Sequence, residues 1–316
     1  MRPLNNAWAT HRVVALFLAV MFIFALVTGG YILTVLSFAA IYAIFTIGLN
    51  FFMGYAGQVT FGQNAFAAIS GYTSAVLTAT YGWEPILALP VGIIGAVVIA
   101  CLVGYPVLRL RGHYLAMATL ALGLIAHEVA VEWGSVTQGY MGISGIPPIG
   151  VGSFELVTPR TVLIFLCVVL AVALWVAYRL KESRFGNALA AIAGSEDAAR
   201  ALGINVPRYK LAAFVIAAVY AAIAGSLIVH FVGFVSPEVF GLSMVISGFM
   251  MLYVGGIGSI FGPLFGALIV GLLPEIFRGF KGYQDLSYGV ALILILIFAP
   301  KGIASVGRLI SRRQRN

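Results

Sequence analysis

The residues with the clearest chemical pattern are amides and hydroxyls that recur in an otherwise apolar segment. Small and polar side chains follow one another at spacings of four, three, four and four, which places them on one face of an α-helix: Gln63, Ala67, Ser70, Ser74 and Thr78. Asn64 adds a second amide next to Gln63. Lipid would exclude this face, so it either packs closely against another helix or lines a wet solute path. Both interpretations are open from the sequence.

A glycine-rich break precedes the polar segment. Asn50 and Gln58 flank a stretch that contains Gly54 and Gly57. A helix broken there leaves backbone groups unpaired, which a membrane tolerates only where they are buried in protein or face water. The break is therefore a candidate lining of a solute path, and a loop that merely re-enters the membrane is the alternative. We predict these substrate-path residues: Gln58, Gln63, Asn64, Ser70 and Ser74.

A second candidate cluster contains the ionisable residues His127, Glu128 and Glu132. The two glutamates lie one helical turn apart. A carboxylate beside a histidine within a membrane suggests a proton relay. Because the cluster falls near the end of an apolar segment, side chains that simply extend to water are the alternative.

Motifs of common catalytic and metal sites are absent from the sequence. No lysine is followed by Ser or Thr, which excludes a Walker A loop. The zinc motif HExxH fails because Val131 stands where the second histidine would be. Cys101 and Cys167 lie inside apolar runs without ligand spacing. We therefore expect no catalytic residue and no metal site in this chain.

One enzymatic pattern is present at residues 142–145. Its sequence GISG resembles the GxSG motif of rhomboid intramembrane proteases, in which the serine pairs with a histidine on a later span. Here Ser144 would be the nucleophile and His230 the base. The serine falls in a loop rich in proline and glycine instead of at a helix start, which argues against a protease.

The elements that carry these residues belong in a bilayer. Of 316 residues, 62% are hydrophobic and 9% are charged, whereas about a quarter of the residues in soluble domains are charged. This composition excludes a soluble enzyme, a nucleic-acid-binding protein and a disordered chain. Ten apolar segments are candidate spans: Val13–Val27, Tyr31–Leu49, Phe61–Thr80, Ile86–Leu108, Leu115–Val131, Thr161–Tyr178, Leu211–Val229, Ser243–Tyr253, Pro263–Leu273 and Leu286–Ala299.

These segments predict an all-α fold, a polytopic membrane protein with about ten transmembrane helices in a single domain over residues 1–316. The eighth and ninth segments are short and rich in glycine, so we expect broken or re-entrant helices there, or helices longer than these limits. The first segment is interpreted as a retained helix, with a cleaved signal peptide as the alternative.

The distribution of charge predicts the orientation of the spans. If the N-terminus is cytoplasmic and all ten segments cross, all of the 18 Lys and Arg residues except Arg160, Arg278 and Lys281 fall on the cytoplasmic side. This agrees with the positive-inside rule, and both termini are then cytoplasmic. The long outer connection, residues 132–160, contains glycines and prolines that predict an ordered, non-helical cap.

The long inner connection, residues 179–210, has a helical pattern that is interrupted at Gly194. Ser195 is suited to cap a second helix, because Glu196 and Asp197 follow in its first turn. We predict two short amphipathic helices at the cytoplasmic face.

A weak internal repeat connects two glycine-rich segments. GYAGQVTFGQNAFAA begins at Gly54 and GGIGSIFGPLFGA begins at Gly255, and the alignment places Gly57 opposite Gly258. Transporters are often built from repeated halves with broken helices at corresponding positions. A chance match between glycine-rich segments is the alternative.

Five stretches, in this order, resemble one family, the LivM-type permease subunit of bacterial branched-chain amino acid ABC importers: LNFFMGYAGQVTFGQNAF, RLRGHYLAMATLAL, TQGYMGISGIP, SRFGNALAAIAGSEDAARALGINVPRYKLAAFVIAAVYAAIAGSL and GGIGSIFGPLFGA. The resemblance implies an ABC importer permease fold in the bacterial inner membrane and a role in importing branched-chain or other hydrophobic amino acids. It also implies a second homologous permease subunit, two cytoplasmic ATPase subunits, a periplasmic binding protein and surrounding lipid as partners, and no nucleic acid. No cofactor is expected on this chain itself, since ATP and Mg²⁺ would be bound by the ATPase subunits.

The resemblance also assigns a role to the inner connection. An ATPase can act on a membrane subunit only through a cytoplasmic element, and residues 182–205 form the only one of adequate size. In the family the matching stretch is the coupling helix that docks on an ATPase. The predicted ATPase-coupling residues are Glu182, Arg184, Gly186, Glu196, Asp197, Arg200 and Gly203, with the glycines shaping the turns. An ordinary solvated amphipathic loop is the alternative.

The sequence departs from the family pattern in two places. Ala193, Gly194 and Ser195 stand where an Arg-Glu pair is common, and Gln138 stands where a second glycine is usual. Two alternative functions therefore stay open. One is a permease for urea or another small polar solute, and the other is a stand-alone secondary transporter that uses Glu128 as its proton site.

Overall fold

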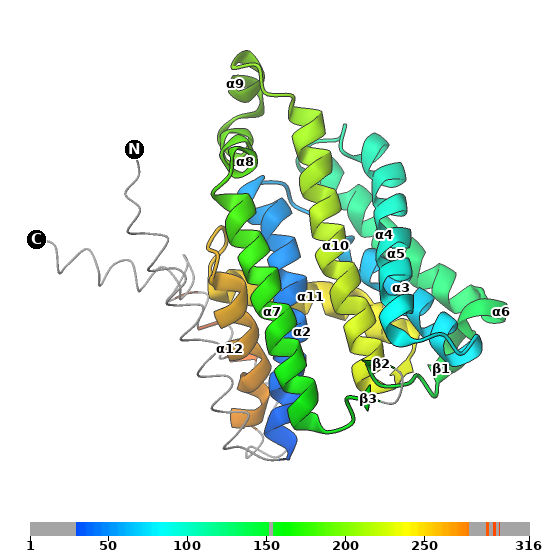
Figure 1. Cartoon of the computed structure of the whole chain (residues 1–316). Helices are drawn as coiled ribbons and strands as arrows, with labels where there is room; N and C mark the ends of the chain where they lie inside the picture. The colour runs from blue at the N-terminus through cyan, green and yellow to red at the C-terminus, as the bar shows by residue number, and fades with distance from the viewer. Residues whose placement is uncertain (1–29, 152–153, 278–288, 291–292, 295–296, 298–316) are drawn as a thin grey trace, which may run out of the picture.

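The structure is a computed structural model that describes residues 30–151, 154–277, 289–290, 293–294 and 297. The long helices lie side by side (Figure 1). They are α2 (Tyr31–Leu49) with the π-helix η1 (Asn50–Tyr55), α3 (Gln63–Ala75) with the π-helix η2 (Val76–Thr80), α4 (Pro85–Val107), α5 (His113–Glu132), α7 (Pro159–Lys181), α10 (Val206–Val232), α11 (Leu242–Gly255) and α12 (Gly262–Ile276). Shorter elements connect them: α6 (Gly134–Thr137), η3 (Gly139–Met141), α8 (Arg184–Gly194), α9 (Glu196–Ala201), η4 (Pro237–Phe240), β1 (Ile143–Ser144), β2 (Gly150–Val151), β3 (Phe154–Glu155) and β4 (Phe234–Val235).

Every candidate span between Tyr31 and Leu273 corresponds to a helix, and the predicted all-α class is confirmed. The two short candidates are longer than their predicted limits, with 14 residues in α11 and 15 in α12. The candidate span at 13–27 lies outside the described residues, and the described residues of 286–299 are helical. In the described part of the chain, six helices are long and apolar enough to cross a membrane. α3 is not among them, because its amides and hydroxyls lower its hydropathy.

Small residues allow α3 to pack closely against α10 and α4. The backbone of Ala67 in α3 touches Gly225 of α10, where a side chain would not fit. On the α4 side, a Cβ atom added to Gly92 would lie 2.7 Å from Ser70 Oγ. Since lipid chains are as apolar as leucine, close van der Waals contact of this kind is what holds membrane helices together.

The two glycine-rich breaks that resemble each other in sequence lie against each other in space. Asn50 Oδ1 accepts a hydrogen bond from Gly258 N–H at 2.8 Å, and Asn50 Nδ2 donates to the Ser259 carbonyl at 2.6 Å. The aligned residues Gly57 and Gly258 both adopt a left-handed backbone, with φ of 66° and 74°. A helix begins shortly after each break. The similarity in sequence therefore extends to the backbone conformation, as expected of an internal repeat.

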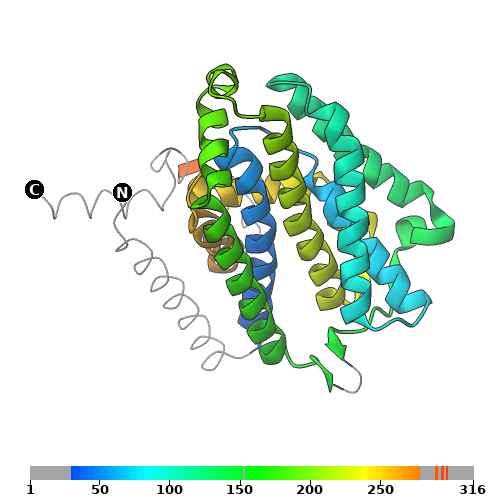
Figure 2. The ribbon, with the colours of Figure 1, turned by 45° about the horizontal axis from the view of Figure 1, so that its top comes forward.

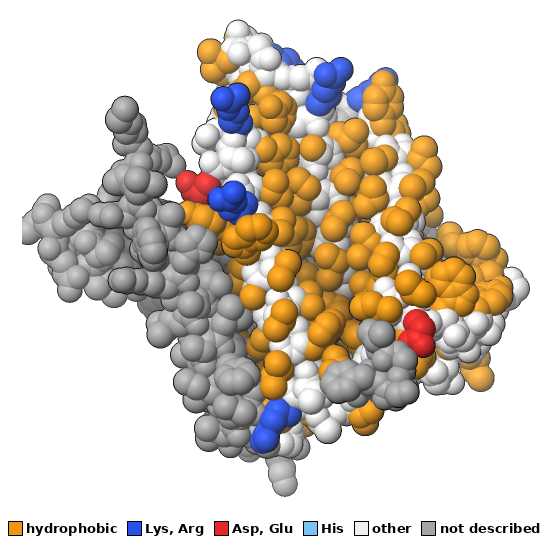
Figure 3. Space-filling model, viewed as in Figure 1, with side chains coloured by type: hydrophobic (Ala, Val, Ile, Leu, Met, Phe, Trp, Pro, Cys, Tyr) orange, Lys and Arg blue, Asp and Glu red, His pale blue; other side chains and the backbone are white. Residues whose placement is uncertain are grey.

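Most of the described basic residues lie at one end of the bundle, which we call the basic end. The α4–α5 and α7–α10 connections meet there, since Arg111 Nε lies 3.6 Å from a carboxylate oxygen of Glu196. In Figure 3, Lys and Arg side chains gather at the upper end, above a wide hydrophobic band. The basic end comprises Arg109, Arg111, Arg179, Lys181, Arg184, Arg200, Arg208 and Lys210.

The connection at 132–160 is non-helical over most of its length, as its glycines and prolines predicted, but not at its start. One α-helical turn, α6, and one 3₁₀ turn, η3, follow directly after α5. The hydroxyl of Thr137 donates to the Trp133 carbonyl at 2.8 Å and stabilises the first of these turns. Further along, β1 pairs antiparallel with β4, and β2 with β3. The β1–β4 pairing joins this connection to the end of α10.

The close contact between α3 and α10 makes the replacement Gly225→Ala destabilising. Alanine is intrinsically the better helix former, but its methyl group would meet the Ala67 carbonyl. Overpacking of this kind costs about 1–3 kcal/mol. We expect a lower melting temperature for the detergent-purified protein.

Gly95→Ala in α4 is the matched control, because the nearest atom to the added methyl group is 3.8 Å away. Its melting temperature should equal or exceed that of the wild type. An equal loss of stability in both variants would contradict the role of the Gly225 contact.

Candidate functional site

The predicted coupling segment folds as two short helices beyond the ends of the long ones, at the upper edge of Figures 1 and 2. Ser183 caps α8, since its Oγ accepts from Phe185 N–H at 3.1 Å. Ser195 caps α9 in the same way and accepts from Ala198 N–H at 3.2 Å. α8 buries Leu189 against the bundle. The prediction of two helices that are interrupted at residues 194–195 is confirmed.

Glu196 is the centre of a polar network that ties α9 to the bundle. Its Oε1 accepts hydrogen bonds from Lys210 Nζ at 2.9 Å and Gln58 Nε2 at 3.2 Å. Its Oε2 lies 3.3 Å from Arg200 Nη2 and 3.6 Å from Arg111 Nε. The side chain of Lys210 is 2% exposed and that of Glu196 is 15% exposed. A charge as buried as that of Lys210 requires a partner, which makes this ion pair structurally important.

The break before α3 meets the coupling segment at two points. One is the hydrogen bond from Gln58 to Glu196. The other is a close backbone contact, because a Cβ atom added to Gly57 would lie 3.1 Å from Ala193. The left-handed φ of Gly57 also favours glycine. A displacement of α8 and α9 therefore acts directly on the chain that leads into α3.

The other charged residues of the predicted coupling set lie on the surface. Glu182, Arg184 and Asp197 are exposed. Asp197 Oδ1 lies 2.8 Å from Arg200 Nη1 and 3.8 Å from Arg111 Nη1. Their exposure leaves these side chains accessible to another protein, whereas Glu196 is directed into the bundle.

Of the two glycines predicted to shape turns, only Gly203 lies in one, since Gly186 belongs to the first turn of helix α8. Gly186 lies against the carbonyl of Lys181, where a side chain would not fit. Gly203 has a left-handed φ of 81° directly after α9, and nothing lies within 4 Å of an added Cβ atom. The first glycine is required by close approach and the second by backbone conformation.

Two partners of Glu196 were not identified from the sequence. Lys210 lies at the start of an apolar helix, and a lysine there is a signal for a carboxylate nearby. Arg111 belongs to a connection far away in the sequence, so no local pattern links it to Glu196. Gln58, which was predicted to lie on the substrate path, donates a hydrogen bond to Glu196 of the predicted coupling segment.

The polar face of α3 packs against α10. Ser70 Oγ lies 2.7 Å from Ser226 Oγ, and Ser74 Oγ lies 2.7 Å from His230 Nε2. Both serines are fully buried. The amide of Gln63, which is also buried, has no hydrogen-bond partner among the described residues. Within this chain the serines thus join two helices, and a role for the face in solute transfer stays a prediction.

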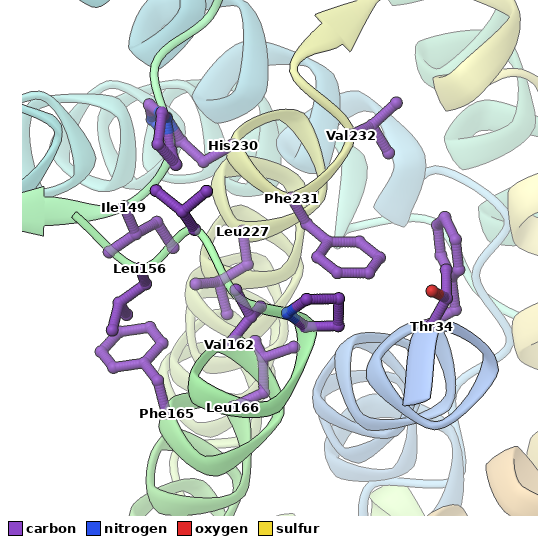
Figure 4. A pocket seen from close by; sticks show the side chains of 14 residues that line it. Thr34, Ile149, Leu156, Val162, Phe165, Leu166, Leu227, His230, Phe231 and Val232 are labelled. Atoms are coloured by element: carbon purple, nitrogen blue, oxygen red, sulfur yellow. The ribbon is translucent and has the colours of Figure 1, made fainter. Parts of the chain in front are cut away.

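His230 also contacts the 132–160 connection. Its Nδ1 lies 2.8 Å from the Pro147 carbonyl oxygen while its Nε2 faces Ser74. Both ring nitrogens are therefore engaged away from Ser144, which is exposed on β1. Figure 4 shows His230 at the edge of an apolar cavity of about 440 Å³, lined by residues that include Thr34, Leu156, Val162, Phe165, Leu227 and Phe231. The geometry does not support a protease pair.

The ionisable cluster at the end of α5 includes a residue from another element. His127 Nδ1 lies 3.8 Å from Glu128 Oε1, and its Nε2 lies 3.9 Å from Glu238 Oε1 of η4. Glu132 is exposed one turn further on. Across the described residues, no group of three or more His, Cys, Asp or Glu side chains could hold a metal ion.

The chain is similar to known membrane transport proteins over most of its length. The family model described as branched-chain amino acid transport system / permease component matches residues 31–299. The high-affinity branched-chain amino acid transport system permease protein LivM of Escherichia coli K12 is 33% identical over 291 residues, which cover 85% of this chain and 68% of LivM. LivH of the same strain is 28% identical, covering 83% and 90%. BraD of Pseudomonas aeruginosa is 26% identical, covering 85% and 92%.

The buried pair of Glu196 and Lys210 predicts a large effect of Glu196→Gln. Removing one partner of a buried ion pair leaves an uncompensated charge, at a cost of about 3–5 kcal/mol. We expect a marked fall in the melting temperature of the purified protein. The double variant E196Q/K210M, which removes both charges, should recover much of the loss.

Asp197→Asn is the matched control, because its side chain is 79% exposed. Exposed ion pairs contribute about 0–1 kcal/mol, so its melting temperature should change little. Equal destabilisation by D197N and E196Q would show that burial of the Lys210 charge is not what matters.

Proposed function

The chain belongs to the family of permease components of branched-chain amino acid transport systems, and from this premise we propose that it is the membrane-spanning subunit of an ATP-binding cassette importer. Its solutes would be branched-chain or other hydrophobic amino acids that a periplasmic binding protein delivers. The chain itself carries out no bond chemistry. ATP and Mg²⁺ bind to partner subunits.

The observation that carries this proposal is the contact between the exposed coupling segment and the break before α3. Glu196 and Ala193 of that segment touch Gln58 and Gly57, respectively. An ATPase that moves α8 and α9 would thereby move a segment that enters the buried centre of the bundle. A stand-alone transporter has no need of such a link to an external helix pair.

The orientation follows from the same contact. We place the basic end in the cytoplasm, where the positive-inside rule and two ATPase subunits both require it. Both termini are then cytoplasmic, and the chain is a multi-pass protein of the bacterial inner membrane. The binding protein docks at the opposite end, over the 132–160 connection. A second, homologous permease subunit completes the translocation path.

The predicted substrate-path residues have separate roles in this proposal. Ser70 and Ser74 hold α3 against α10. Gln63 and Asn64 stand at the start of α3 with unused hydrogen-bonding capacity. Because these buried amides lack partners within the described chain, we propose that they meet solute or water when the path opens. Gln58 transmits motion from the coupling segment.

Reconstitution in proteoliposomes tests the proposal against its alternatives. Uptake of radiolabelled leucine should require ATP, both ATPase subunits, the second permease subunit and the binding protein. Uptake by this chain alone, driven by a proton gradient and abolished by Glu128→Gln, would support a secondary transporter instead. Transport of urea with no transport of leucine would support a permease for small polar solutes.

A sharper prediction concerns the exposed coupling residue Arg184. The replacement Arg184→Glu should lower solute-stimulated ATP hydrolysis by the complete importer about tenfold, because it reverses a charge at the ATPase interface. Arg184→Lys is the conservative control and should retain most of the activity. Since Arg184 is exposed, membrane insertion and melting temperature should be unchanged in both variants. Full coupled activity in R184E would rule out an ATPase contact at this position.

A further inference from the structure

A cavity of about 390 Å³ lies where α3, α5 and the start of α11 meet. Ligand pockets for small molecules commonly have volumes of about 300–1,000 Å³. Its polar lining comes from four elements, α3, α5, η4 and α11, and comprises Asn64, His127, Glu128, Glu238 and Ser243. Phe61 and Leu120 add apolar surface. The cavity therefore combines a few polar groups with an apolar wall.

The cavity extends from the middle of α5 towards the end of this helix that is away from the basic end, where His127 and Glu128 lie. Gly123 of its wall is near the middle of the 20-residue helix α5. At 1.5 Å per residue, ten residues from the basic end correspond to about 15 Å, half of the hydrocarbon thickness. Solute sites of transporters are typical of this depth.

Asn64 has an unsatisfied hydrogen-bond acceptor at this cavity. Its side-chain Nδ2 donates to the Phe240 carbonyl at 2.9 Å. Its Oδ1 has no partner among the described residues, although Asn64 is only 3% exposed. Gly123 packs against this oxygen, since a Cβ atom there would lie 2.5 Å from it, and the oxygen is almost fully enclosed. A buried acceptor without a partner costs stability, so it points to a donor that the cavity receives.

The other side chains at the mouth of the cavity also accept hydrogen bonds. Glu128 and Glu238 lie on either side of His127, and their side chains are 71% and 75% exposed. Lipid excludes ionised carboxylates, so this face of α5 and η4 must meet water or protein. Two carboxylates and an amide oxygen together favour a ligand with a cationic donor, such as an ammonium group.

The start of α11 can bind a negatively charged group of the same ligand. This helix has 14 residues and begins at Leu242, after Gly241. The first backbone N–H groups of a helix lack partners within it and attract anions. Gly241, Leu242 and Ser243 all line the cavity. A carboxylate can therefore bind here while an ammonium group binds at Glu128 and Glu238.

We propose that this cavity binds the transported solute as a zwitterion, with its ammonium group at Glu128, Glu238 and Asn64 Oδ1 and its carboxylate at the N-terminus of α11. Its apolar side chain lies against Phe61 and Leu120. The inference rests on the proposed function, because it takes a hydrophobic amino acid as the solute. It adds a solute site in this chain, separate from the selection made by a binding protein.

Binding of radiolabelled leucine to the complete importer in nanodiscs, without the binding protein and without ATP, tests the site. Glu128→Gln and Glu238→Gln should each weaken leucine binding about tenfold, the expected loss of one charged hydrogen bond. Glu132→Gln is the matched control. It lies on the same helix and is exposed, but it does not line the cavity, so it should bind leucine like the wild type.

Competition with two analogues tests both ends of the site. 4-Methylpentanoate lacks the ammonium group and isoamylamine lacks the carboxylate. The concentration of each analogue that displaces half of the bound radiolabelled leucine should be at least about tenfold higher than that of unlabelled leucine. Equal competition by either analogue would overturn the zwitterion assignment. If E128Q and E238Q bind leucine as tightly as E132Q and the wild type do, the two carboxylates extend to water and do not bind the solute.

Uptake assays separate failure of the site from failure of the proposed function. If wild-type importer takes up leucine with ATP and the variants bind leucine normally, the site is wrong and the function stands. If the wild-type complex takes up no leucine under any condition, the proposed function is wrong. Folding of each variant is checked by its melting temperature, and the control E132Q, outside the cavity, should also leave basal ATP hydrolysis unchanged.

Discussion

The buried charge of Lys210 is the constraint on which the arrangement at the basic end depends. A lysine that is 2% exposed is stable only with a carboxylate beside it. Glu196 supplies that carboxylate, and α9 is thereby held against α10. Because Glu196 also contacts Gln58 and lies close to Arg111, one side chain fixes the position of the exposed helix pair relative to three parts of the bundle. A coupling element needs this rigidity, since a loosely attached helix would move without moving the bundle.

Small residues play the corresponding structural role within the membrane. Glycine and alanine bring α3 against α10, and the paired hydroxyls of Ser70 and Ser226 satisfy each other there. Hydrogen bonds between neighbouring membrane helices contribute modestly, and they remove the cost of burying polar groups. The start of α3 differs, because the amide of Gln63 and Oδ1 of Asn64 have no such partner in the described chain. Further along α3, the hydroxyl of Tyr72 is also buried without a hydrogen-bond partner in the described chain.

The coupling network and the cavity are connected by one short stretch of chain, residues 58–64. Gln58 at one end contacts Glu196, and Asn64 at the other end lines the cavity. Most of this stretch is not helical, so it can change conformation without unwinding a helix. This stretch therefore links the predicted coupling helices to the cavity. The proposed solute site and the proposed ATPase contact then act on the same structural element.

The sequence by itself determined the helical class, the positions of the helices between Tyr31 and Leu273 and the pair of short helices, of which Ser195 caps the second. These features depend on local properties, namely the length of apolar segments and the hydrogen bonds of capping residues. The glycine content of the 132–160 connection led to a wrong prediction at its start, because Thr137 stabilises a helical turn there that composition does not reveal.

Only the tertiary structure decided what the polar side chains contact. From the sequence, the polar face of α3 was consistent with helix packing or with a solute path. The structure shows that its serines contact Ser226 and His230 of α10, which is distant in the sequence. The partners of Glu196 and the meeting of His127 with Glu238 likewise join segments far apart in the chain. Such contacts follow from how whole helices pack, and this information is not contained in the spacing of residues along any one of them.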